Sequence, residues 1–152
     1  MYASSGNMVN AQELASAVAK DMEEKAAKAA NDPSAGHYSD KEIAHAYLVT
    51  GNYNKALEYA INEYNRRPGN IEINQLVAWI YYKNKNAAAA LQHLQKAMIT
   101  KNQNPALLFT AASIYKQTGD VAKAQILLSG LTRNKPLLPY YLQKDYNGLS
   151  GK

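Results

Sequence analysis

The residues of this sequence that could carry out chemistry are few and stand far apart. The three histidines, His37, His45 and His93, are too widely spaced for a local metal-binding motif, and no carboxylate pair stands at ligand spacing beside them. Ser113 has no evident base nearby to activate its hydroxyl. The absence of cysteine excludes thiol nucleophiles, thiolate metal sites and disulfides. We therefore expect no catalytic activity, no metal and no cofactor.

Glycine and lysine patterns bear on phosphate and nucleic-acid binding. Phosphate-binding loops need glycines clustered before a helix, whereas Gly51 and Gly119 stand alone at predicted turns. The net charge of +5 is uneven, because residues 1–70 hold 7 Lys/Arg against 9 Asp/Glu and residues 71–138 hold 8 against 2. A nucleic-acid site needs a continuous basic track with stacking aromatics. The lysines of the basic half instead alternate between predicted helices that face different ways, so nucleic-acid binding stays a minor alternative.

The elements that must position these side chains follow from an internal repeat of 34 residues. Residues 47–60 (YLVTGNYNKALEYA) align with residues 81–94 (YYKNKNAAAALQHL) and residues 115–128 (YKQTGDVAKAQILL). One aligned position is always Tyr, another is always Ala, and a third is always a residue that caps helices: Tyr47, Tyr81 and Tyr115; Ala56, Ala90 and Ala124; Asn52, Asn86 and Asp120. A repeat of this length indicates a stack of equivalent supersecondary units.

Each unit is predicted to form two helices. Apolar residues at helical spacing, capping residues and terminating prolines place helices at about 40–50, 53–66, 71–83, 87–101, 105–117 and 121–133. Lys85 stands where the other two units have glycine. A left-handed conformation there would cost a residue with a β-carbon about 1 kcal/mol. We therefore expect Asn84 to take up that conformation instead.

This pattern resembles the tetratricopeptide repeat family, whose units are 34-residue helix–turn–helix pairs. Counted from His37, Ile71 and Pro105, the small eighth, aromatic eleventh and alanine twentieth positions all match, over 102 of the 152 residues. The large aromatic usual at the fourth position is absent, since Asp40, Asn74 and Leu108 stand there. In detail the chain is similar to repeats of bacterial proteins of this family. The resemblance implies an all-α fold, a right-handed superhelical array or α-solenoid of three units at 37–70, 71–104 and 105–138.

The two ends fall outside the repeats. Residues 1–36 are predicted to form an amphipathic helix and a linker, with Leu14, Val18, Met22 and Ala26 in one stripe. One interpretation packs this helix on the first repeat, and a second places it in the groove of its own or a neighbouring molecule. Residues 139–152 are predicted to be a cap and tail, with a short capping helix over 136–146 and loose residues after it.

The resemblance further implies that the first helices of the units line a concave surface that binds peptides or partner helices. The predicted partner-binding residues on it are Lys41, His45, Gln75, Trp79, Tyr82, Lys83, Phe109, Ser113 and Lys116. Aromatic anchors such as Trp79, Tyr82 and Phe109 contribute about 2 kcal/mol each at interface hot spots, and Lys83 and Lys116 favour an acidic ligand. The alternative is that Trp79 packs in the core.

We therefore expect a non-catalytic scaffold or adaptor for protein–protein interaction. The alternative from another class is a structural segment of a larger bacterial protein that self-associates through its acidic first half and basic second half. No stretch approaches the roughly 18 apolar residues of a membrane span, and the N-terminus lacks the pattern of a secretory signal. We expect a soluble chain, either cytoplasmic or exported with an upstream signal removed.

Overall fold

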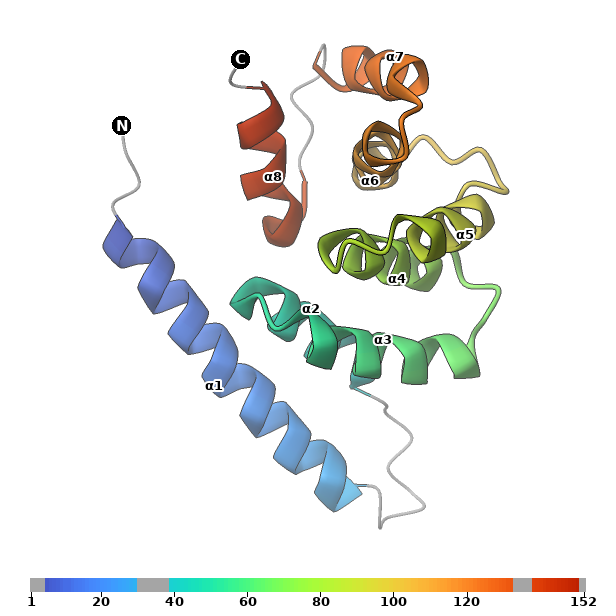
Figure 1. Cartoon of the computed structure of the whole chain (residues 1–152). Coiled ribbons are helices and arrows are strands. Elements are labelled where there is room, and N and C mark those ends of the chain that lie inside the picture. Colours follow the sequence, from blue (N-terminus) through green and yellow to red (C-terminus); the bar gives the residue numbers. More distant parts are fainter. Residues whose placement is uncertain (1–4, 30–38, 133–137, 151–152) are drawn as a thin grey trace. The chain divides into compact units, whose positions relative to one another are not determined.

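A computed structural model describes residues 5–29, 39–132 and 138–150. All regular structure in these ranges is α-helical (Figure 1), and the helices are α1 (Ser5–Ala29), α2 (Asp40–Thr50), α3 (Tyr53–Arg66), α4 (Ile71–Lys83), α5 (Ala87–Ala97), α6 (Pro105–Gln117), α7 (Val121–Thr132) and α8 (Tyr140–Ser150). The predicted all-α fold of repeated helix–turn–helix units is confirmed. Residues 30–38, with the end of the predicted N-terminal segment and His37, and residues 133–137, with the start of the predicted capping helix, lie outside the described residues.

Helix boundaries follow the caps that the sequence supplies. The side-chain oxygens of Asn70, Asn86 and Asn104 accept hydrogen bonds from the backbone N–H groups of the first turns of α4, α5 and α6, at 3.0, 3.2 and 2.8 Å. Pro105 occupies the first turn of α6, where its missing N–H costs nothing. Helix α5 ends at Ala97 rather than near 101, because the chain turns at 98–101 and Lys101 adopts a φ of 54°.

The turns inside the helical hairpins share one backbone geometry. The N–H groups of Asn52, Asn86 and Asp120 each donate to the carbonyl of the repeated tyrosine five residues earlier, at 3.0, 2.9 and 2.9 Å. This bond belongs to the Schellman motif, which needs a left-handed residue just before the donor. Lys85 fills that position with a φ of 62°, so the prediction for Asn84, whose φ is −79°, was wrong. The hydrogen-bond pattern decides which residue is left-handed, and residue preference yields to it.

The chain divides into two compact units, residues 1–63 and 64–152, which are described separately. In the first unit α1 packs along α2, and Glu23 of α1 accepts hydrogen bonds from Lys55 and Tyr59 of α3, at 2.8 and 2.7 Å. Burial opposes ionisation of Glu23, but these two bonds lower its pKa. This packing agrees with the interpretation that α1 covers the first hairpin. The start of the predicted stripe stays exposed, Leu14 at 67% and Val18 at 38%.

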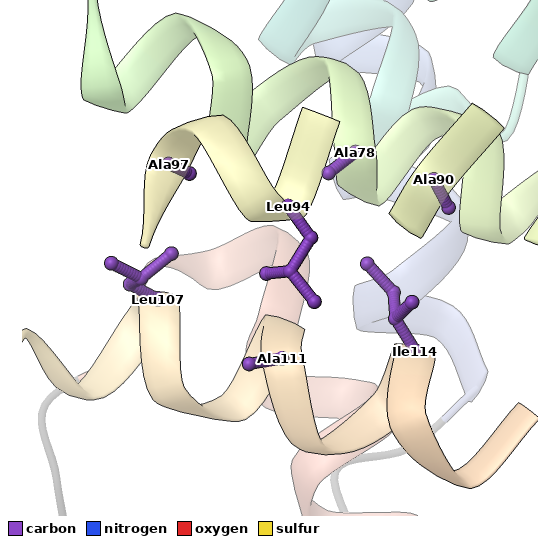
Figure 2. Packing of buried hydrophobic residues seen from close by; sticks show 7 residues of the cluster. All are labelled: Ala78, Ala90, Leu94, Ala97, Leu107, Ala111 and Ile114. Carbon is purple, nitrogen blue, oxygen red and sulfur yellow. The ribbon is translucent and has the colours of Figure 1, made fainter. Parts of the chain in front are cut away.

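The second unit contains the hairpins α4–α5 and α6–α7. Figure 2 shows Leu94 of α5 pointing toward α6, where Leu107, Ala111 and Ile114 face it. Alanines at 78, 90 and 97 complete this fully buried cluster, and their small side chains let the helices approach closely. The repeated Tyr81 and Tyr115 pack against the same cluster, partly buried. The repeat signature therefore marks the positions that join one hairpin to the next.

Candidate partner-binding face

The nine predicted binding residues are divided between the two units. Lys41 and His45 lie half-buried on α2 in the first unit. The other seven lie on α4 and α6 in the second unit. The candidate site is therefore the surface of these two helices that carries Trp79, Tyr82, Lys83 and Phe109, which we call the α4–α6 face.

An aromatic cluster of Trp79, Tyr82, Phe109 and Tyr146 runs along this face. Trp79 stacks on Tyr82, with ring centroids 4.8 Å apart, and lies 5.9 Å from Phe109. Phe109 in turn meets the ring of Tyr146 from α8 edge-on, at 5.4 Å. Trp79 and Phe109 are 1% and 0% exposed, whereas Tyr82 is half-buried, and burial raises the Tyr82 pKa. Offset and edge-on ring pairs of this kind each contribute about 1 kcal/mol beyond their buried area.

The burial of Trp79 and Phe109 removes both rings from the surface that a partner could contact. These two rings are not solvent-facing in this structure, which agrees with the alternative that Trp79 packs in the core. Tyr82 and Lys83, both half-buried, are the predicted residues of the aromatic part of the face that reach solvent. A role in partner binding for any of the nine residues remains a prediction.

Lys83 is paired with an acidic residue of α8. Its Nζ lies 2.9 Å and 3.1 Å from the two carboxylate oxygens of Asp145, with the side chains only 22% and 29% exposed. The same Nζ lies 5.7 Å from the Trp79 ring centroid, within reach of a cation–π interaction. Lys83 thus has an acidic partner within this chain, and an acidic ligand for it stays a prediction.

Helix α8 is the part of this site that sequence reasoning underestimated. It continues to Ser150, whereas the prediction was a short helix over 136–146 with loose residues after it. Leu142 is fully buried, and burial raises the pKa of its neighbour Tyr141 to about 12. The signal was available in the sequence, since Leu138, Leu142 and Tyr146 recur every four residues and form one helical stripe.

The other three predicted binding residues of the second unit lie outside the aromatic cluster. Gln75 is buried, 9% exposed, and Ser113 is 2% exposed with its hydroxyl donating to the Phe109 carbonyl at 2.9 Å. That hydroxyl is used within its own helix and is not presented to a ligand. Lys116 is exposed in the last turn of α6.

A polar network occupies the corner where the repeat pattern lacks its aromatic. Asn74 is 1% exposed, and its Nδ2 donates to the carbonyls of Pro68 and Asn70, both at 2.8 Å. Because both amide hydrogens are used, the Oδ1 of Asn74 must accept from Nδ1 of His93 at 3.1 Å, which fixes that proton on Nδ1. We call Asn74, His93 and the two carbonyls the Asn74 network. It ties α4 to α5 and to the preceding turn.

Aromatic rings enclose His93 within this network. Tyr64 meets the imidazole edge-on at 4.9 Å, and Tyr81 stacks on it at 5.7 Å. Lys96 lies nearby, with its Nζ 2.6 Å from the Tyr64 hydroxyl. Burial first, and then the positive charge of Lys96, lower the pKa of His93. His93 is therefore held neutral as a structural residue.

The described residues show neither a metal-binding cluster nor a membrane-spanning helix. No group of three or more His, Asp or Glu side chains there is arranged to hold a metal ion. None of the helices described is both long and apolar enough to cross a bilayer.

Part of the chain matches a known family of proteins. Residues 81–143, from the last turn of α4 into α8, match a family model described as tetratricopeptide repeat. The comparisons with curated proteins and with solved structures returned no match. The matched segment includes α5, α6 and α7, and hence one side of the α4–α6 face.

Proposed function

We propose that the α4–α6 face binds a segment of a partner protein, because residues 81–143 match the tetratricopeptide repeat, whose repeats generally mediate protein–protein interaction. In this role the protein is a non-catalytic scaffold or adaptor. The proposal rests on the surroundings of Lys83, where an aromatic cluster, a half-buried cation and a half-buried tyrosine lie together. Such a mixture of buried ring and partly desolvated charge is typical of interface hot spots.

The chemistry of the face favours an acidic segment with apolar anchors. Lys83 holds a carboxylate with both oxygens in reach, and Lys116 adds a second cation, which is exposed, on the same helix pair. A charge-assisted pair that is partly shielded from water is stronger than one on an open surface. The rings beside it supply apolar area that a purely electrostatic site would lack.

The test uses the full chain as bait and measures the affinity of a purified partner. Replacing Trp79 or Phe109 would remove core side chains, at a cost of about 3–5 kcal/mol in stability, so the informative variants are Tyr82→Ala and Lys83→Gln. We expect each to weaken partner binding about tenfold, the equivalent of 1.4 kcal/mol. The matched control is Lys123→Gln on α7, whose lysine is 62% exposed and lies off this face. Equal affinity of all three variants, with helicity unchanged by circular dichroism, would exclude the α4–α6 face as the binding site.

The two alternatives from the sequence give different results. Nucleic-acid binding predicts steeply salt-dependent retention on a nonspecific oligonucleotide. Self-association of the acidic and basic halves predicts a larger species in sedimentation at low ionic strength that dissociates as salt is added.

A further inference from the structure

Helix α8 contacts the α4–α6 face through two residues, and a third residue on the same stripe is buried. Leu142 is fully buried, Asp145 pairs with Lys83 at 2.9 Å, and Tyr146 lies edge-on to Phe109 at 5.4 Å. These residues stand at positions i, i+3 and i+4, which fall on the same side of a helix. The opposite side carries residues that are exposed, Gln143, Lys144, Asn147 and Gly148. Helix α8 therefore uses the face as an amphipathic helical ligand would.

The sequence of α8 makes it a weak helix on its own. It has 11 residues, and isolated helices of that length are marginal in water. Gly148 lies within it and reduces its helical propensity further. The segment also falls after the third predicted repeat and has no partner helix in the repeat pattern. Its helical structure therefore depends on contact with the face, and loss of that contact would leave an unstructured segment rather than a free helix.

We propose that α8 is an intramolecular ligand of the α4–α6 face, and that the partner segment is an amphipathic helix that displaces it by carrying the same three features. Those features are an apolar residue, a carboxylate and an aromatic ring at positions i, i+3 and i+4. This proposal rests on the proposed function, because it describes the occupant of that same face. The partner can bind only those molecules in which α8 has left the face, so its apparent affinity falls in proportion to that uncovered fraction.

The test measures exchange directly with a peptide of residues 138–150 labelled with fluorescein. A tethered segment has an effective concentration of about millimolar, so the peptide is expected to bind the unmodified chain weakly. In the full-length double variant Asp145→Lys with Tyr146→Ala, α8 loses both of the side-chain contacts that join it to the face. We expect the peptide to bind that variant at least tenfold more tightly, as measured by fluorescence anisotropy. Equal affinity for both chains, or no binding to the released chain, would overturn the proposal.

Two controls keep the result specific to this contact. A peptide in which Asp145 is replaced by lysine should lose affinity for the double variant, and should regain it when that chain also carries Lys83→Glu. The milder full-length variant Asp145→Asn should speed hydrogen exchange of the α8 amides while α4 and α6 stay protected. Uniformly faster exchange in all three helices would mean that α8 is part of the folded core, contrary to the proposal.

The outcome is separable from that of the proposed function. If the native partner binds the unmodified chain and the double variant with equal affinity, while Lys83→Gln weakens it, the face binds a partner but α8 does not compete. If Lys83→Gln leaves the partner unaffected in the double variant, where α8 no longer competes for Lys83, the proposed function fails, and the peptide experiment still decides whether α8 exchanges.

Discussion

Replacing Asn74 with alanine is expected to destabilise the second unit more than an asparagine-to-alanine substitution usually does. The change removes three side-chain hydrogen bonds, two at 2.8 Å to carbonyls and one at 3.1 Å from His93, at a position only 1% exposed. The Asn70 carbonyl keeps the backbone N–H of residue 74, so the groups left without this partner are the Pro68 carbonyl and the His93 ring nitrogen. At about 1 kcal/mol per bond, the loss is about 3 kcal/mol.

Two corrections act on this figure. Alanine has a higher helix propensity than asparagine, which returns about 0.5 kcal/mol. The space left by the side chain loses packing contacts, which adds to the cost. The expected decrease in the free energy of unfolding is therefore about 2–3 kcal/mol.

The assay is urea denaturation followed by circular dichroism, with hydrogen exchange of the α4 and α5 amides as a local measure. The matched control is Asn62→Ala at an exposed position within α3, for which we expect a change within about 0.5 kcal/mol. A second variant, Asn74→Asp, can accept from His93 but cannot donate to the two carbonyls, so it should be at least as destabilising as alanine at neutral pH. A loss below about 1 kcal/mol for Asn74→Ala would refute the network as a source of stability.

Two further predictions concern the buried histidine and the turns inside the helical hairpins. The folded state lowers the pKa of His93 below its ordinary value of 6.5. Its contribution to stability is therefore constant above pH 6.5 and decreases as the pH falls, because the unfolded chain takes up the proton more readily. Urea titrations from pH 7.5 to 5 should show that the free energy of unfolding depends less on pH in His93→Phe, and an identical pH dependence in both chains would contradict this. Lys85→Gly should raise the stability by up to about 1 kcal/mol, since it relieves a φ of 62°, and Gly51→Ala should lower it by a similar amount; a lower melting temperature for Lys85→Gly would show that the turn is not strained.

Features that depend on neighbouring residues were predicted from the sequence. The bounds of α2, α3, α4 and α6 follow from caps such as Asn70, from apolar periodicity and from Pro105 at a helix start. The repeat distance likewise indicated the family. These interactions join residues within one or two helical turns, so the chain order contains most of the information needed to locate them. Lys85 shows the limit, because the hydrogen bonds of the turn, rather than residue preference, set its conformation.

Tertiary structure decided which residues of the candidate site are buried and which are paired. The sequence identified Trp79, Tyr82, Lys83 and Phe109 as one face and left open whether Trp79 packs in the core. It did not indicate that Phe109 would be buried or that Asp145, 62 residues after Lys83, would pair with that lysine. Nor did it indicate that Asn74 would replace a missing aromatic with a hydrogen-bond network. Docking of α8 and formation of that network depend on summed contacts between segments distant along the chain. Those contacts exist only once the helices are packed, so no local pattern encodes them.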